Sequence, residues 1–268
     1  MEENHISSFF LRVLCVSSAF SAVLLSFSVL AADDFLPVRG ATFRSVLPVT
    51  KNSNEVVLPD FRLAQTPVTN AAFLEFVRRN PQWQRGRVPA LFTDDGYLRH
   101  WAGPLSLGNV DPQQPVVQVS WFAAQAYCEA QGARLPSWHE WEWAAAADGK
   151  VADAREDPAW RQQMLNWYAE TGSGALPRIG RNAPNRYGVH DLHGLVWEWV
   201  DDFGAMMVSG DNREQGDPDL MKFCGSGALT MEQKENYAVL MRIAMLSSLR
   251  AAYTTANLGF RCARDAAP

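Results

Sequence analysis

Residues able to do chemistry gather in the stretch from 185 to 202, which reads NRYGVHDLHGLVWEWVDD. Asp191 and Glu198 supply two carboxylates, and a loop that folds back between them would present the hard oxygen ligands that Ca²⁺ prefers. The alternative is a polar turn between two core tryptophans, Trp197 and Trp199. The carboxylate spacing favours hard-cation chemistry at this turn.

Two histidines, His190 and His193, flank Asp191 at a spacing of three residues, which could suggest a transition-metal site. We expect instead that they are loop residues that position the turn. Two metal sites here would place two different ions almost on top of one another.

The chain contains four cysteines, Cys15, Cys128, Cys224 and Cys262. Cys15 lies in an N-terminal segment that we expect to be removed, and an exported protein with three cysteines usually has one disulfide and one free thiol. A free thiol can be an inert buried side chain or a nucleophile. Both interpretations stay open.

The N-terminus has the architecture of a signal peptide: Arg12, an apolar run from Val13 to Leu30, then two alanines. We therefore expect residues 1–32 to be cleaved and residues 33–268 to form one periplasmic or secreted domain, with no membrane association after cleavage. The alternative is a retained single-span anchor, because the apolar run approaches the length of a membrane span.

Composition limits the classes of partner. The formal net charge is -5 and the isoelectric point is near 5.6, and no lysine or arginine cluster occurs in the sequence. These values argue against a nucleic-acid surface. With 268 residues, of which 47% are hydrophobic, the chain fits one large domain with a substantial core.

Three helices and a strand should position these residues. Cap signals predict helices that start after Thr69, Ser120 and Ser137, the last with a capping box to Glu140. The alternation in PVVQVSW, residues 115–121, predicts a strand. The segments 91–114 and 169–187 are rich in Gly, Pro, Asn and Asp, which is typical of long ordered loops.

Four stretches together resemble the formylglycine-generating, or sulfatase-modifying factor, family. They follow the family's order and span nearly all of the mature chain: TPVTNAAFLEFV (66–77), PVVQVSWFAAQAYCEAQGARLPSWHEWEWAAAA (115–147), NRYGVHDLHGLVWEWVDD (185–202) and NLGFRCARD (257–265). The resemblance implies a single irregular α+β domain, akin to C-type-lectin-like folds, with little regular secondary structure.

The resemblance implies a structural calcium ion and a disulfide. The residues at the family's calcium positions are Asp191, Gly194, Val196 and Glu198. A second calcium position would begin near Asn166, but the loop that follows it is shortened here to GSGALPRIG. The resemblance also pairs Cys128 with Cys262, and closing so long a loop would contribute roughly 4 to 5 kcal/mol in the chain-entropy model.

The resemblance also defines a groove, and here the sequence departs from the family. Cys224, in FCGSGAL, replaces the first glycine of the family's GGSW-type segment. Formylglycine-generating enzymes hold copper(I) just after it, between two cysteines five residues apart, because soft thiolates suit that ion. Residues 229–238 contain no cysteine, so copper is not expected. Ser226 and Arg242 are further candidate groove residues, although Arg242 could simply form an ion pair.

Three functions stay open at this point. The first is an accessory or maturation factor for a periplasmic client, since family members without the copper cysteines resemble proteins encoded beside nitrite reductases or required to finish the pyoverdine chromophore. The second is an oxidase or other modifying enzyme acting on a peptide or a siderophore-like molecule. The third is a calcium-ordered binding domain. Whether the chain is an enzyme is not decided by its sequence.

Overall fold

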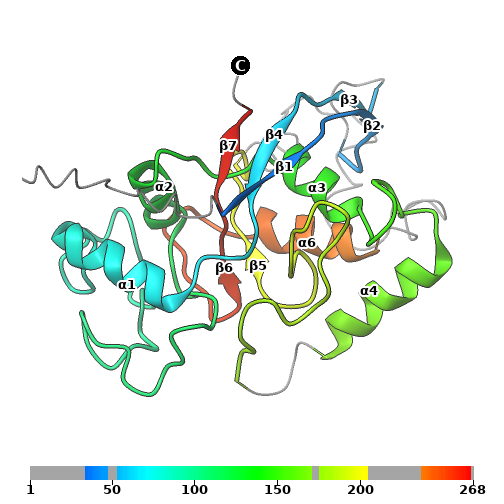
Figure 1. The fold of residues 1–268 in the computed structure, drawn as a ribbon. Helices are drawn as coiled ribbons and strands as arrows, with labels where there is room; N and C mark the ends of the chain where they lie inside the picture. The colour runs from blue at the N-terminus through cyan, green and yellow to red at the C-terminus, as the bar shows by residue number, and fades with distance from the viewer. Residues whose placement is uncertain (1–33, 48–52, 171–174, 205–236, 267–268) are drawn as a thin grey trace, which may run out of the picture. The chain divides into compact units, whose positions relative to one another are not determined.

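The computed structural model describes residues 34–47, 53–170, 175–204 and 237–266, and those residues belong to one compact unit that begins at Asp34 (Figure 1). The predicted signal segment 1–32, Cys224 and Ser226 lie outside the described residues. Within the described part of the chain, no helix has the length and apolar character needed to cross a membrane.

The three predicted helices form with their predicted caps. Helix α1 (Asn70–Arg79) is capped by Thr69, α2 (Trp121–Ala130) by Ser120, and α3 (Trp138–Ala146) by Ser137. Each cap side chain accepts a hydrogen bond from a backbone N–H of the first turn, which would otherwise lack a partner. In α3 the Glu140 side chain completes the capping box.

The structure also contains helices that were not predicted from the sequence. Helix α4 (Pro158–Glu170) precedes the turn that carries Asp191, and α6 (Tyr237–Ser247) carries Arg242. A short 3₁₀ helix, η1 (Pro81–Trp83), follows α1. In Figure 1, α1 and α2 lie on one side of the three-stranded sheet, and α3, α4 and α6 lie on the other.

Three small sheets complete the fold. Strands β1 (Phe35–Val38), β4 (Phe61–Ala64) and β7 (Ala263–Asp265) form an antiparallel sheet in which β4 is central. Strands β2 (Thr42–Arg44) and β3 (Glu55–Val57) pair separately and antiparallel. Strands β5 (Trp197–Glu198) and β6 (Leu258–Gly259) are two residues each and pair in parallel. The predicted irregular α+β fold with little regular structure is confirmed.

The predicted strand at residues 115–121 is wrong. Pro115 makes one isolated antiparallel bridge with Thr69, and no strand continues from it. The backbone of Gln118 takes a φ of 54°, in the left-handed region, which interrupts any extended run. The apolar side chains of this segment are nevertheless buried, with Val116, Val117 and Val119 at 0%, 4% and 0% exposure. Because successive residues are buried, the segment does not show the alternating burial of a half-exposed strand.

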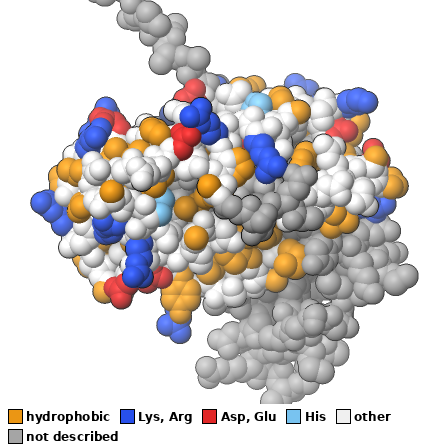
Figure 2. Space-filling model, turned by 90° about the horizontal axis from the view of Figure 1, so that it is seen from below, with side chains coloured by type: hydrophobic (Ala, Val, Ile, Leu, Met, Phe, Trp, Pro, Cys, Tyr) orange, Lys and Arg blue, Asp and Glu red, His pale blue; other side chains and the backbone are white. Residues whose placement is uncertain are grey.

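The core is filled largely by aromatic side chains. Its largest fully buried members are Trp138, Trp141, Trp199, Phe61, Phe73 and Phe260. A disulfide joins Cys128 on α2 to Cys262 beside β7, with Cα atoms 5.5 Å apart, which is the pairing that the family resemblance implied. Outside, positive, negative and apolar side chains are interspersed on the face seen in Figure 2.

Candidate functional site

The short β5–β6 pair places Glu198 in the centre of the domain. Glu198 pairs in register with Gly259, and a Cβ at Gly259 would lie 2.5 Å from the carbonyl oxygen of Val116. Only glycine allows that close approach of the backbone. The Glu198 side chain is fully buried, so its negative charge needs a partner inside the protein.

Arg261 provides that partner. Its Nε donates to Glu198 Oε2 at 2.8 Å and its Nη2 donates to Oε1 at 2.8 Å, a two-pronged ion pair in which both side chains have 0% exposure. Trp141 Nε1 donates to the same Oε2 at 2.9 Å. The remaining donors of Arg261 reach backbone carbonyls of Ala64 and His190. The pair is therefore satisfied on both sides, as a buried charge requires.

A second buried arginine, Arg242 on α6, approaches Glu198 from its backbone. Its Nη2 donates to the Glu198 carbonyl oxygen at 2.5 Å, and its guanidinium lies 3.6 Å from the ring centroid of Trp141. Among the described residues, Nε and Nη1 have no hydrogen-bond partner. Burial lowers the pKa of Arg242 to about 10, with the carboxylate of Glu198 opposing that shift.

His193 is a third basic side chain in this region, and it is neutral. Its ring packs among aromatic neighbours that include Trp141, Trp160 and Trp167. Nε2 lies 2.8 Å from the carbonyl oxygen of Ala145, which makes Nε2 the donor, and Nδ1 lies 3.2 Å from the Tyr168 hydroxyl. Burial lowers the pKa of His193 to about 4. Both ring nitrogens of this histidine therefore make polar contacts within the turn region, and its predicted role in positioning the turn stays a prediction.

The turn from Asp191 to Val196 is shaped by two residues with positive φ. Asp191 has φ 58° and Gly194 has φ 78°. A Cβ at Gly194 would lie 2.6 Å from Cβ of Trp167, so glycine is required where the turn packs on α4. The Asp191 carboxylate accepts hydrogen bonds from the backbone N–H groups of Gly180 and Asn182.

The predicted calcium ligands fit an ion only in part. Glu198 is already neutralised by Arg261, whereas the hydrogen-bond donors to Asp191 are neutral amides. Among the described residues no group of three or more His, Cys, Asp and Glu side chains gathers as a metal site would need. An ion at this turn would have to share Glu198 with a guanidinium. Calcium binding at Asp191, Gly194, Val196 and Glu198 therefore stays a prediction.

The groove candidates divide between described and undescribed parts of the chain. Arg242 is described, and among the described residues it forms no ion pair; its guanidinium lies against the neutral ring of Trp141 instead. Arg250 lies 5.8 Å from the ring centroid of Tyr253, and both side chains are exposed. Cys224 and Ser226 lie outside the described ranges, so their relation to Arg242 stays a prediction.

Sequence reasoning missed Arg261, the central partner of Glu198. The residue stands in LGFRC, between positions that are almost all buried, and an arginine among buried apolar residues was the available signal. Its partner lies 63 residues earlier in the chain, which no local spacing reveals.

Comparison with known proteins identifies the family. Residues 28–266 match the model of the sulfatase-modifying factor enzyme 1-like domain. The chain is 31% identical over 258 residues to a formylglycine-generating enzyme of Streptomyces coelicolor, covering 79% of this chain and 80% of the relative. It is 28% identical over 251 residues to the mouse inactive C-alpha-formylglycine-generating enzyme 2, covering 80% and 78%.

Among solved structures, PvdO from Pseudomonas aeruginosa is similar at a TM-score of 0.48 and 17% identity, over 86% of this chain and 94% of PvdO.

Family membership supports a role in modifying or maturing another molecule. The ordered motifs, the irregular α+β fold and the matched residues together show that this chain belongs to the sulfatase-modifying factor, or formylglycine-generating enzyme, family.

Proposed function

We propose that this protein is an exported maturation or accessory factor that acts on a periplasmic client without copper-dependent formylglycine generation. One observation carries the proposal: the disulfide between Cys128 and Cys262 uses two of the three cysteines in the matched domain. Cys224 is then the one remaining thiol in that domain, and copper(I) held between two thiolates needs a pair.

The relatives allow this function. One of them is named an inactive member of the family and covers four fifths of this chain, so the fold exists in a relative that is named inactive. The central pair of Glu198 and Arg261 is fully buried and satisfied, which suits a structural role rather than proton transfer to a substrate.

The reaction class is tested directly by mixing the purified mature protein with copper and a sulfatase peptide that carries the target cysteine. We expect no formylglycine in the peptide by mass spectrometry, while an active bacterial family enzyme run in parallel converts it. Conversion by this protein that is lost in Cys224→Ser would overturn the proposal.

For the client we propose a nitrite-reductase-type enzyme, with a siderophore of the pyoverdine kind as the second candidate. The test is deletion of the gene in the producing organism, followed by measurement of periplasmic nitrite reductase activity and of siderophore chromophore absorbance. Loss of nitrite reductase activity that is restored by the wild-type gene supports the first client. Loss of chromophore alone supports the second, and no change in either contradicts both.

A further inference from the structure

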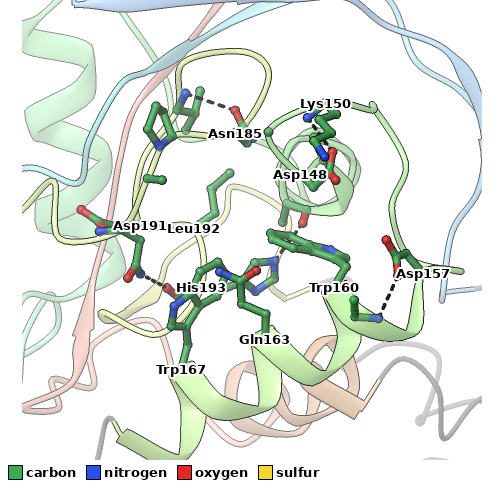
Figure 3. A pocket seen from close by; sticks show the side chains of 18 residues that line it. Asp148, Lys150, Asp157, Trp160, Gln163, Trp167, Asn185, Asp191, Leu192 and His193 are labelled. Carbon is green, nitrogen blue, oxygen red and sulfur yellow. Dashed lines mark hydrogen bonds between the residues drawn. The ribbon is translucent and has the colours of Figure 1, made fainter.

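A pocket of about 360 Å³ opens between α4 and the segment from Asn182 to His193 (Figure 3). Trp160, Gln163 and Trp167 rise into it from α4, at the spacing that places residues on one face of a helix. Its volume lies in the range of small-molecule and side-chain pockets. Neither Arg242 nor the Glu198–Arg261 pair lines it, so it is distinct from the buried centre.

The charges around the pocket are mostly negative. Asp148, Asp157 and Asp191 line it, against a single lysine, Lys150. Backbone hydrogen bonds lower the pKa of Asp148, which keeps it ionised, with the charges of Lys150 and Arg186 as smaller causes. The three carboxylates accept hydrogen bonds from neutral backbone amides and form no ion pair within the described residues. The pocket therefore favours a positive ligand.

The aromatic wall favours an organic cation over a bare metal ion. Trp160 and Trp167 contact each other at 5.5 Å between ring centroids, and the ring of His193 packs against both. Indole rings attract cations through their negative faces. A cation with an apolar stem can contact this wall, whereas a bare metal ion gains no ligand from it.

Two polar groups of α4 make no hydrogen bond within the described residues and could bond to the backbone of a bound peptide. Trp160 Nε1 is buried and has no hydrogen-bond partner among the residues that the structure describes, and an unsatisfied buried donor is unfavourable by about 1–3 kcal/mol. Gln163 is exposed, and its carboxamide forms no hydrogen bond in the described structure. An indole N–H needs an acceptor such as a peptide carbonyl, and a carboxamide both donates and accepts as a peptide group does.

We propose that this pocket binds a lysine-type alkylammonium side chain together with the peptide groups beside it. Figure 3 shows Asp191 across the pocket from Asp148 and Asp157, so the carboxylates surround the pocket and do not form one planar clamp. A spread of negative charge suits the point charge of an ammonium, whereas a guanidinium prefers a single carboxylate matched to its fork. The site goes beyond the proposed function, which names no pocket for the client.

The test uses Nα-acetyl-lysine amide as the probe, titrated into the mature protein by calorimetry or NMR in a buffer with EGTA. Nα-acetyl-norleucine amide is the neutral control of similar shape, and n-pentylamine presents a single alkylammonium without a peptide group. We expect the lysine amide to bind at least tenfold more tightly than the norleucine amide and at least threefold more tightly than n-pentylamine. Equal binding of the first two overturns the charge selection. Equal binding of n-pentylamine overturns the peptide assignment.

A double variant, Asp148→Asn with Asp157→Asn, removes two charges while leaving folding intact. Asparagine can still accept the backbone hydrogen bonds that each aspartate receives, including the one from the Ala159 N–H at the start of α4. We expect at least fivefold weaker binding of the lysine amide. Glu55→Gln, an exposed change on β3 away from the pocket, is the matched control and should bind as wild type. Unchanged binding in the double variant overturns the proposal.

Discussion

Two fully buried arginines lie on either side of Glu198 and are stabilised in different ways. Arg261 meets the carboxylate with two hydrogen bonds and gives its other donors to backbone carbonyls. Arg242 donates to the backbone carbonyl of Glu198 and lies on the face of Trp141, and two of its nitrogens have no hydrogen-bond partner in the described part of the chain. The charge of Arg261 is stabilised by an ion pair with a carboxylate, whereas the charge of Arg242 is stabilised mainly by the face of an indole ring. Replacing the two arginines should therefore change the free energy of unfolding by different amounts.

The sharpest test removes the paired arginine. Arg261→Met leaves Glu198 buried and uncompensated, and we expect a loss of about 3–5 kcal/mol in the free energy of unfolding, measured with urea. The double variant with Glu198→Gln removes both charges and should recover part of that loss. If Arg261→Met unfolds at the wild-type urea concentration, the pair does not stabilise the domain.

His193 extends the comparison to a basic group that is buried without charge. Its pKa of about 4 in the folded protein is below the ordinary value of 6.5, so the unfolded chain binds more protons between these pH values. The contribution is present above pH 6.5 and is lost as pH falls toward 4, by up to roughly 3 kcal/mol.

This effect is measured as the free energy of unfolding at pH 7 and pH 4.5 in wild type and His193→Gln. The free energy of unfolding should decrease less in the variant than in wild type, because glutamine has no proton to bind. Both proteins share the other titrating groups, so the contribution of those groups cancels when the two decreases are subtracted. Parallel pH profiles for the two proteins would mean that His193 titrates normally in the fold.

Replacing the arginine that lies on the indole should have a smaller effect. For Arg242→Met we expect a loss of about 2 kcal/mol or less, since the variant leaves no buried carboxylate unpaired and loses a desolvated cation–π contact and one hydrogen bond to a backbone carbonyl. Urea unfolding beside Arg261→Met gives the comparison directly. A loss as large as that of Arg261→Met would show that the two arginines are energetically equivalent.

Removal of calcium should have the smallest effect. Because Arg261 already neutralises Glu198, we expect EGTA to lower the free energy of unfolding by less than about 1 kcal/mol. That value corresponds to a free calcium concentration only a few times the dissociation constant of the site. Metal analysis before and after chelation supplies the stoichiometry. One tightly held calcium per chain, with a loss above that of Arg242→Met, would contradict this expectation.

The sequence predicted the parts of the fold that depend on near neighbours. The caps of α1, α2 and α3 are local, since each links a side chain to a backbone N–H three residues away, and all three were found from sequence. Helix α4 has a comparable start signal, Asp157 followed by Pro158, but the prediction did not use it. The segment around Gln118 looked like a strand because apolar alternation also fits an irregular buried segment.

The candidate site was less predictable, for a physical reason. The turn at Asp191 was found because its residue types are unusual, but the partner of Glu198 is far along the chain, on a segment brought close only by the β5–β6 pairing. The unsatisfied N–H of Trp160 was not predicted, because the sequence around a helical tryptophan does not indicate whether its indole N–H has an acceptor. Such contacts depend on the completed fold.

The antiparallel pairing of β4 with β7 also governs when the domain can fold. Phe61 faces Asp265 in this ladder, and Arg134 pairs with Ala263. The central strand therefore cannot complete its pairing until residues at the far end of the chain are present. Contacts between residues distant in sequence form slowly. The domain cannot close its main sheet during synthesis, and a chain truncated before β7 would leave an open strand edge, which is prone to aggregation.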